Sequence, residues 1–348
     1  MVIDANVYWF PEQVFKDEAL LGQFLADIPR AYGTVGKVRD SKAGKEIVIE
    51  RPAGSPGVNY AEGDYVLETQ LAHMNQAGID KAVMKVPCCH EWLGLSMARL
   101  FNDGMADYAR RSGGRMVPLA VIPPFGGQAS LRELERCRKE LGMKGIQMSA
   151  HYGDLYLDDE AFAPLFEKLE EYRMTVYVHH TPLPVDNASL LAYNNLRRSY
   201  GRCTDQMIAV CREMMSGMFE HYPHIRMVHS MLGGGFFAFK DMMIPSSSVG
   251  NDSVKRFEDN GGSMNRYFSK NIFFETSHAQ PWGREALECA VKTLGSDHII
   301  YGSSYPVRME WLTGGAEFVK SLDITEEDKE KILWKNAMRL YGISGEGK

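Results

Sequence analysis

The chain has 348 residues, of which 45% are hydrophobic and 24% are charged, and its formal net charge is −6. This ordinary globular composition excludes extensive disorder, and because no basic stripe with interleaved aromatic residues is present, we expect no nucleic-acid partner. We also expect a cytoplasmic protein away from the membrane, because the N-terminus lacks a signal-peptide pattern, no apolar run reaches the ~20 residues that span a bilayer, and the six cysteines are scattered.

Short apolar runs alternate with longer amphipathic stretches, a pattern typical of parallel strands joined by crossover helices. The strand-like runs are Val2 to Tyr8, Lys81 to Pro87, Arg115 to Ile122, Lys144 to Ser149, Thr175 to His180, Ile225 to Ser230, Asn271 to Glu275 and His298 to Gly302. The helical stretches between them are Leu67 to Gly78, Met97 to Arg110, Ser130 to Leu141, Asp158 to Tyr172, Met207 to His221, Arg284 to Leu294 and Ala316 to Leu322. This alternation predicts an α/β fold, a (β/α)8 TIM-type barrel that forms one domain over residues 1–348.

Two segments interrupt the repeat, and each follows the C-terminal end of a strand, where barrel enzymes build their sites. About residues 30–64 are rich in Gly and Pro and contain the strand-like run Glu46 to Glu50, so we expect an insertion that serves as a lid or an oligomer arm. Residues 245–265 are rich in Ser, Gly and Asn and predict a long loop. Thr325, followed by acidic residues, predicts the N-cap of a C-terminal helix over the barrel.

Histidines stand at the ends of two consecutive predicted strands. The fifth strand ends at His179 and His180, and the sixth ends at His229, ahead of the run Gly233 to Gly235. Because side chains alternate along a strand, only one of His179 and His180 should face the barrel axis. A lone strand-end histidine is commonly a satisfied core residue, but two of them one unit apart, followed by glycines that admit close backbone approach, favour a site.

Further motifs lie at Ile3 to Tyr8 on the first strand, at Tyr301 to Pro306 on the eighth, and at Asn336-Ala337 with Leu340-Tyr341-Gly342 near the C-terminus. With the strand order and the stretch 102–182, they resemble amidohydrolase family two, within it most of all the aminocarboxymuconate semialdehyde decarboxylases and gamma-resorcylate decarboxylases. The resemblance covers nearly the whole chain apart from the insertion after the first strand. It implies the barrel fold, a small aromatic or unsaturated carboxylic acid as substrate, and a homo-oligomer, for which we expect a dimer.

In that family a D-x-H-x-H motif on strand one, a histidine ending strand five and an aspartate ending strand eight hold a divalent metal, and a histidine on strand six assists catalysis. The resemblance implies that His179 is the strand-five ligand and His229 the strand-six catalytic histidine. Asn6 and Tyr8, however, stand where the paired histidines belong, and Ser304 stands where the aspartate belongs. Neutral Asn and Ser are poor ligands for a borderline-soft cation. We therefore expect no cofactor and a site without metal; a divalent metal such as zinc, held in an unusual shell completed by Asp4, Glu275 or His180, is the disfavoured alternative.

Without a metal, developing negative charge must be stabilised by hydrogen-bond donors and cationic groups, and protons must be moved by side chains. The residues expected to be catalytic are His229, His179 and Tyr8. The residues expected to bind substrate are Asn6, His151, His180, Ser304 and Arg308, the last because a planar guanidinium matches a carboxylate. Each role has a structural alternative: Tyr8 packs in the core, or Arg308 pairs with Glu310 at the surface. A cysteine nucleophile in the pair Cys88-Cys89 is a minor alternative.

Three functions compete on this evidence. The first is a non-oxidative carboxy-lyase, which the resemblance favours. The second is a metal-independent hydrolase or lactonase, or a cyclase, that uses histidine acid–base catalysis. The third is a barrel that binds a ligand without transforming it.

Overall fold

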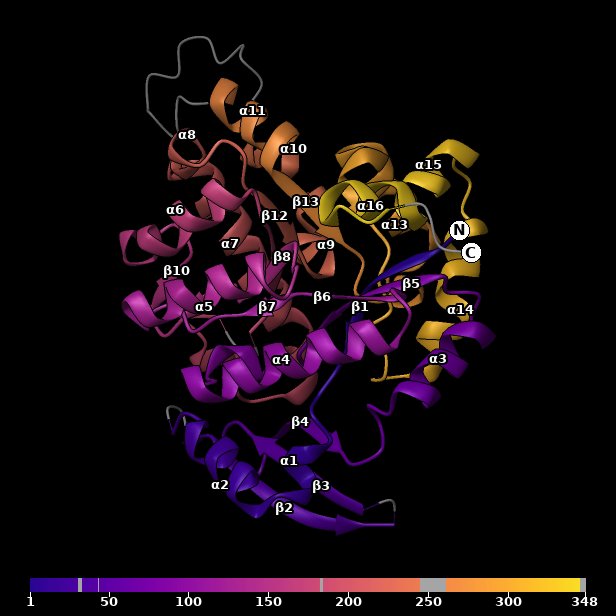
Figure 1. Ribbon diagram of the computed structural model, residues 1–348. Coiled ribbons are helices and arrows are strands. Elements are labelled where there is room, and N and C mark those ends of the chain that lie inside the picture. Colours follow the sequence, from indigo (N-terminus) through magenta and orange to yellow (C-terminus); the bar gives the residue numbers. More distant parts are fainter. Residues whose placement is uncertain (31–32, 43, 182–183, 245–260, 345–348) are drawn as a thin grey trace.

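The computed structural model describes residues 1–30, 33–42, 44–181, 184–244 and 261–344, and parallel strands form its centre (Figure 1). The barrel strands are β1 (Ile3–Tyr8), β5 (Lys81–Lys85), β6 (Met116–Pro118) with β7 (Ala120–Val121), β8 (Gly145–Ser149), β11 (Thr175–His179), β12 (Arg226–His229), β13 (Ile272–Glu275) and β14 (Ile299–Ile300). Each pairs in parallel with the next, and β14 leads back to β1 through a bridge between Val7 and Tyr305. The predicted (β/α)8 barrel is confirmed.

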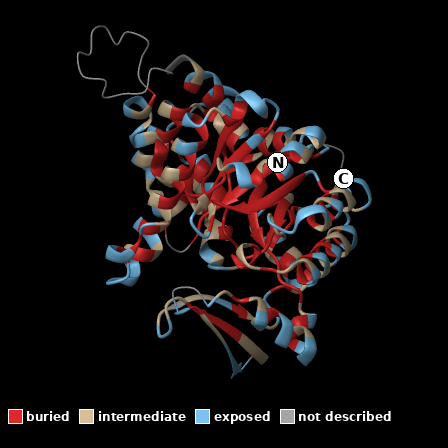
Figure 2. Cartoon of the chain, turned by 90° about the vertical axis from the view of Figure 1, so that its left-hand side faces the viewer, coloured by how far each residue is buried: buried red, intermediate tan, exposed pale blue. Residues whose placement is uncertain are grey.

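Amphipathic helices return the chain from strand to strand and cover the outside of the barrel, so that buried strands lie inside a partly exposed shell (Figure 2). These helices are α3 (Leu67–Gln76), α4 (Leu95–Arg111), α5 (Gly127–Lys139), α6 (Ala163–Tyr172), α7 (Arg202–Met215), α8 (Met218–His221), α13 (Arg284–Leu294) and α14 (Met309–Lys320). Helix α4 illustrates why these helices pack against the barrel, because it buries Met97, Phe101 and Met105, which are spaced along one face of the helix. Each predicted helical stretch overlaps one of them.

The C-terminal helices close the N-terminal end of the barrel. Thr325 caps α15 (Glu326–Glu330) by accepting the Asp328 backbone N–H, and α16 (Asn336–Tyr341) follows. Leu340 and Tyr341 of α16 pack against the apolar layer inside the barrel. That layer consists of Ile3, Ala5, Val83, Leu119, Tyr177, Val228, Phe273 and Ile300. The predicted terminal helix thus plugs one end, and polar chemistry is left to the opposite, C-terminal strand ends.

The segment after β1 forms a small layer of its own at the other end of the molecule from the termini (Figure 1). It consists of α1 (Gln13–Lys16), α2 (Glu18–Asp27) and an antiparallel sheet of β2 (Val35–Ser41), β3 (Gly44–Glu50) and β4 (Pro56–Ala61). The predicted strand-like run lies within β3, whereas α1, α2 and the two flanking strands were not predicted. Tyr60 fixes this sheet to the barrel mouth, since its ring stacks on Phe10 at 4.6 Å and its hydroxyl donates to the Pro87 carbonyl at 2.7 Å.

The predicted loop at 245–265 falls mostly outside the described residues, and its last part differs from the prediction, because α11 (Gly261–Asn271) already begins at Gly261. Among the helices that the structure describes, none has the length and apolar character needed to cross a membrane. The single domain, the cytoplasmic location and the dimer stay predictions.

Candidate active site

Strand β1 contains a β-bulge at the barrel mouth. Between Asp4 and Val7 its register against β5 shifts by one residue. Before the shift, Ala5 belongs to the apolar layer inside the barrel. Beyond it, Asn6 and Tyr8 also reach into the barrel, where their partners come from β11 and β13. The bulge therefore turns both side chains toward the mouth.

Asp4 points away from the mouth. Its carboxylate accepts the Ser303 backbone N–H at 2.9 Å and the Asn6 backbone N–H at 3.0 Å. Burial raises its pKa to about 6. Asp4 fastens β1 to the turn after β14, as a structural acceptor.

Asn6, Ser304 and Glu275 form a hydrogen-bonded layer below the mouth. The Asn6 amide donates to a Glu275 carboxylate oxygen and to the Ser304 hydroxyl, both at 3.0 Å, and Ser304 donates in turn to the Ser277 carbonyl at 2.6 Å. Glu275 also accepts the Tyr177 hydroxyl at 2.7 Å, and burial raises the pKa of its carboxyl. Among the described residues, the Asn6 carbonyl oxygen Oδ1 has no hydrogen-bond partner.

Lys85 and Gly302 adjoin this layer. The Lys85 ammonium is fully buried, donates to the Ala5 carbonyl at 3.0 Å and lies 3.6 Å from the centre of the Tyr177 ring. Burial lowers its pKa to about 7. A Cβ at Gly302 would stand 1.9 Å from a Glu275 carboxylate oxygen, so only glycine fits there. Sequence pattern alone did not mark Lys85, because a single lysine in an apolar run carries no motif.

The histidines that end β11 meet Tyr8 and Cys88. His179 Nδ1 lies 2.7 Å from the His180 carbonyl oxygen, which only accepts, so Nδ1 carries the proton and Nε2 accepts the Tyr8 hydroxyl at 3.0 Å. The His179 and His180 rings stack at 4.2 Å, and burial lowers the pKa of both well below the ordinary value. Cys88 Sγ and one ring nitrogen of each histidine lie within 4.8 Å of one another. Burial raises the pKa of this thiol to about 12 and also raises the pKa of Tyr8.

A cavity of about 450 Å³ opens above these groups. The segment after β1 contributes one wall through Val58, Asn59 and Tyr65. The remaining lining includes Tyr8, Cys88, His180, Arg198, Arg202, Met231, Ser277, His278, Ser304, Pro306, Val307 and Trp311. Of the residues expected at the site, Tyr8, His180 and Ser304 thus line the cavity, while Asn6 and His179 lie behind Ser304 and Tyr8, to which they are hydrogen-bonded.

Two arginines on this wall were missed by sequence reasoning. Arg198 lies in the π-helical turn Leu196–Gly201, and Arg202 begins α7. The described residues give neither of them a carboxylate partner, and the buried Nε of Arg202 has no hydrogen-bond partner there. Gly234 holds this end of α7 in place, because a Cβ there would lie 1.8 Å from the Cys203 carbonyl oxygen. The close backbone approach expected of the glycine run is confirmed, and it occurs at Cys203, the residue after Arg202.

His229, expected to be the catalytic histidine of strand six, does not lie at the mouth. Val228 points into the barrel, so His229, the next residue on β12, points outward. Its ring is fully buried between β12 and α7, 2.9 Å from the Glu213 carboxylate and 3.1 Å from the Gln206 side-chain oxygen. Ser230, the following residue, is the one directed to His180. His229 is therefore a structural histidine.

His151 and Arg308 also lie away from the cavity. His151 Nε2 is 2.8 Å from the Thr181 hydroxyl and 3.3 Å from Asp205, and it borders a separate hollow of about 510 Å³. Arg308 pairs with Glu310 at 3.0 Å, and both side chains are more than half exposed, at 60% and 65%. The surface pairing that competed with carboxylate binding is the one observed, since helix α14 turns Arg308 outward.

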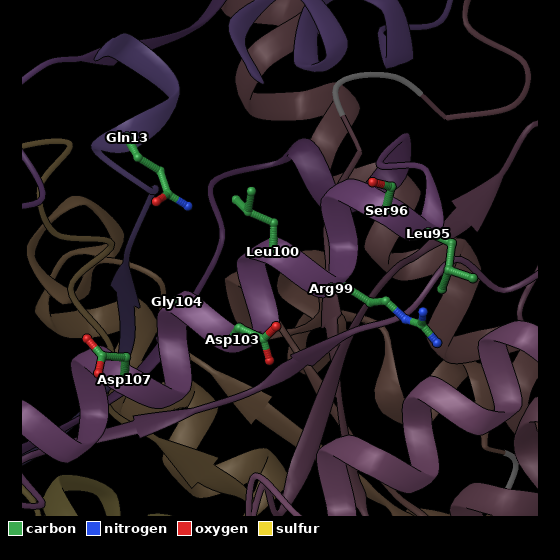
Figure 3. A pocket seen from close by; sticks show the side chains of 8 residues that line it. All are labelled: Gln13, Leu95, Ser96, Arg99, Leu100, Asp103, Gly104 and Asp107. Atoms are coloured by element: carbon green, nitrogen blue, oxygen red, sulfur yellow. The ribbon is translucent and has the colours of Figure 1, made fainter. Parts of the chain in front are cut away.

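A larger hollow of about 810 Å³ lies on the outside of the barrel, along α4 and beside Gln13 of α1 (Figure 3). Its charged residues are already engaged: Arg99 pairs with Glu133 at 3.1 Å, and Asp103 pairs with Arg136 at 2.6 Å. The groups with perturbed pKa values at the strand ends do not reach it. The cavity above Tyr8 is the better candidate site.

Comparison with known proteins confirms the expected relatives. A 2-amino-3-carboxymuconate-6-semialdehyde decarboxylase from Dictyostelium discoideum is 25% identical over 249 residues, which cover 72% of this chain and 67% of that protein. A gamma-resorcylate decarboxylase from Polaromonas sp. (strain JS666) is 26% identical over 260 residues, covering 71% and 76%. The structure of 5-carboxyvanillate decarboxylase from Novosphingobium aromaticivorans superposes with a TM-score of 0.72 at 20% identity, covering 98% of this chain and 96% of that one.

The expectation of a site without a metal cofactor is wrong. The 5-carboxyvanillate decarboxylase structure contains manganese, as does a second matched decarboxylase structure, and in this chain Cys88, His179 and His180 form a set that suits a divalent metal. Three nitrogen and sulfur donors beside an open cavity are the ligand number of a catalytic metal site. The prediction failed because Cys88 was not considered as a ligand: the unusual shell was expected to be completed by Asp4, Glu275 or His180, and the fold instead brings Cys88 to His179 and His180.

The match to a family agrees with the barrel. The amidohydrolase family matches residues 90–343, which is most of the chain and includes the ends of β8, β11, β12, β13 and β14. This chain therefore belongs to the amidohydrolase family.

Proposed function

We propose that this protein is a decarboxylase of a small aromatic or unsaturated carboxylic acid and that the reaction takes place in the cavity above Tyr8. The observation that carries the proposal is the position of Arg202. Arg202 lines a partly apolar cavity, its buried Nε has no partner among the described residues, and Tyr8, Cys88 and His180 line the same cavity. A planar guanidinium in this setting suits a carboxylate.

The cavity walls favour a flat, unsaturated substrate. Tyr65, Met231 and Trp311 supply apolar surface, and the His278 ring stacks on Trp311 at 4.5 Å. Burial and the charge of Arg202 lower the pKa of His278 to about 4, so this ring is neutral at pH 7. The substrate ring is held by apolar contact while its carboxylate faces Arg202.

Decarboxylation breaks the bond between the carboxyl carbon and the ring or chain carbon. The bonding electron pair stays on that carbon, carbon dioxide leaves, and the carbon takes up a proton. Tyr8 is our candidate for the proton donor, because its hydroxyl is on the cavity wall and its raised pKa keeps it protonated at pH 7. While His179 holds no metal, its neutral Nε2 accepts this hydroxyl and keeps it in place. Solvent returns the proton to Tyr8 after each turnover.

A divalent metal held by Cys88, His179 and His180 would supply a Lewis acid next to the substrate carboxylate.

The decarboxylase relatives support carbon dioxide release over the hydrolase and the silent-barrel alternatives.

The test is carbon dioxide release from a panel of hydroxybenzoic and unsaturated dicarboxylic acids, with activated lactones in parallel. The enzyme is used as purified and after loading with zinc or manganese. We expect carbon dioxide from at least one acid and no lactone hydrolysis. Lactone hydrolysis without carbon dioxide would favour the hydrolase instead, and ligand-induced stabilisation without any product would favour the silent barrel.

Arg202→Gln identifies the carboxylate site, with Arg308→Gln as its matched control. A hydrogen bond to a charged group contributes ~1.5–3 kcal/mol, so kcat/KM of Arg202→Gln should fall roughly 10- to 150-fold. Arg308 does not line the cavity but pairs with Glu310 at the surface and lies 5.5 Å from the centre of the Trp311 ring, so its variant should stay far closer to the wild type than Arg202→Gln. Equal kcat/KM for both variants would place the carboxylate elsewhere.

A further inference from the structure

Three candidate metal ligands meet on one side of the barrel mouth. Cys88 follows β5, and His179 and His180 end β11, yet their donor atoms lie within 4.8 Å of one another and all three side chains are buried. Cys88 has a φ of 63°, in the left-handed region that a non-glycine residue rarely occupies. Such backbone strain persists only where the surrounding structure fixes it, and it directs Sγ toward the histidines.

Within the part of the chain that the structure describes, the other side of the mouth offers no comparable set of ligands. The Asn6 amide nitrogen is used by Glu275 and Ser304, and the Ser304 hydroxyl is used by the Ser277 carbonyl. Glu275 accepts hydrogen bonds from Asn6, Tyr177 and the Ser277 backbone on its two oxygens. Of the side chains of Asn6, Ser304 and Glu275, only Asn6 has an atom without a partner among the described residues, its neutral Oδ1. One neutral oxygen does not hold a catalytic metal.

We propose that the metal of this protein is bound by the Cys88 thiolate with His179 and His180, and that this site selects zinc over manganese. The inference deepens the proposed function, but its test does not depend on turnover. Thiolate and imidazole are ligands that favour zinc, whereas manganese prefers carboxylate, carbonyl and water. Cys88 and His180 also line the cavity, so a metal held by them would adjoin the space where Arg202 would hold the substrate.

Binding has a fixed proton balance. The Cys88 thiol gives up its proton to solvent as the sulfur–metal bond forms, and both histidines coordinate in their neutral form, so one proton leaves per metal ion. His179 Nε2 has one lone pair, so it would stop accepting the Tyr8 hydroxyl when it binds the metal. Tyr8 is thereby freed to face the cavity.

The experiment compares metal binding to four full-length, metal-stripped proteins: wild type, Cys88→Ser, His180→Gln and Cys289→Ser. Cys289 is the matched control, because it is exposed on α13 and distant in sequence from the site. Zinc and manganese are titrated by calorimetry in buffers of different ionisation enthalpy, and cobalt is added to detect a thiolate-to-cobalt charge-transfer band. Circular dichroism confirms that each variant is folded.

Wild type and Cys289→Ser should bind one zinc with release of one proton, bind manganese more weakly, and show the cobalt band. Cys88→Ser should lose the band, and both site variants should lose more zinc affinity than the roughly 10- to 100-fold that removal of an outer-shell partner costs. Should Cys88→Ser fail to fold, His180→Gln still decides the outcome. Manganese binding as tight as zinc, or a cobalt complex without the thiolate band in wild type, would overturn the inference.

The two proposals fail in different ways. Zinc bound through Cys88 without carbon dioxide from any acid would leave the metal site intact and refute the decarboxylase. Carbon dioxide release by an enzyme whose metal shows no thiolate signature would support the decarboxylase and refute the proposed metal site.

Discussion

Gly302→Ala should destabilise the protein strongly, because the added methyl group has no room at the level of Asn6 and Glu275. Its Cβ would stand 1.9 Å from a Glu275 carboxylate oxygen and 2.6 Å from the Asn6 Cβ. Overpacking of a filled core costs ~1–3 kcal/mol, and pushing the carboxylate off the Ser277 backbone N–H costs ~1–3 kcal/mol more. We expect the free energy of unfolding to fall by roughly 2–6 kcal/mol.

The assay is urea unfolding followed by circular dichroism, with Gly22→Ala as the matched control. Gly22 lies exposed within α2 and has no atom within 4 Å of an added Cβ, so there alanine should stabilise by ~0.5–1 kcal/mol. The same substitution should thus lower the free energy of unfolding at Gly302 and raise it at Gly22. A Gly302→Ala protein that unfolds at the wild-type urea concentration would refute the close contact between β14 and the Asn6–Glu275 layer.

Three further predictions concern the groups around the site. Lys85→Met should remove a pH dependence of the free energy of unfolding. The pKa of Lys85 is about 7 in the folded protein against an ordinary 10.5, so between these pH values the unfolded chain binds one more proton and wild-type stability rises with pH. Urea titrations of the variant at several pH values should lack this rise. His229→Ala leaves the buried Glu213 without its partner and should lower the free energy of unfolding by ~3–5 kcal/mol. The zinc content of the folded variant should be unchanged. Loss of zinc without loss of stability would contradict the structural role of His229. Tyr8→Phe removes a hydrogen bond of ~0.5–1.5 kcal/mol to His179 Nε2, the atom that would bind zinc. Calorimetry should therefore show zinc binding up to ~10-fold tighter, while turnover falls. Weaker zinc binding would argue against competition between Tyr8 and the metal.

Local chemistry decided the barrel, and so the sequence alone predicted it. Each strand-like run is apolar enough to be buried on both faces, and each following stretch repeats its apolar residues at helical spacing, as α4 does. The cap at Thr325 and the close approach at Gly234 are equally local, because a side chain or its absence sets the backbone at that point. The family resemblance and the strand-end position of His179 followed from these patterns.

Side-chain direction and long-range contacts were decided only by the tertiary structure. A single residue of register separates His229, which faces α7, from Ser230, which faces the mouth, and a sequence does not state where a strand begins to alternate. The bulge in β1 reverses that alternation again for Asn6. Cys88 and His179 are far apart along the chain and become neighbours only because the barrel closes. Cys88 as a candidate ligand and Arg202 were therefore beyond sequence reasoning, since their proximity to the histidines is a property of the closed sheet and not of any one segment.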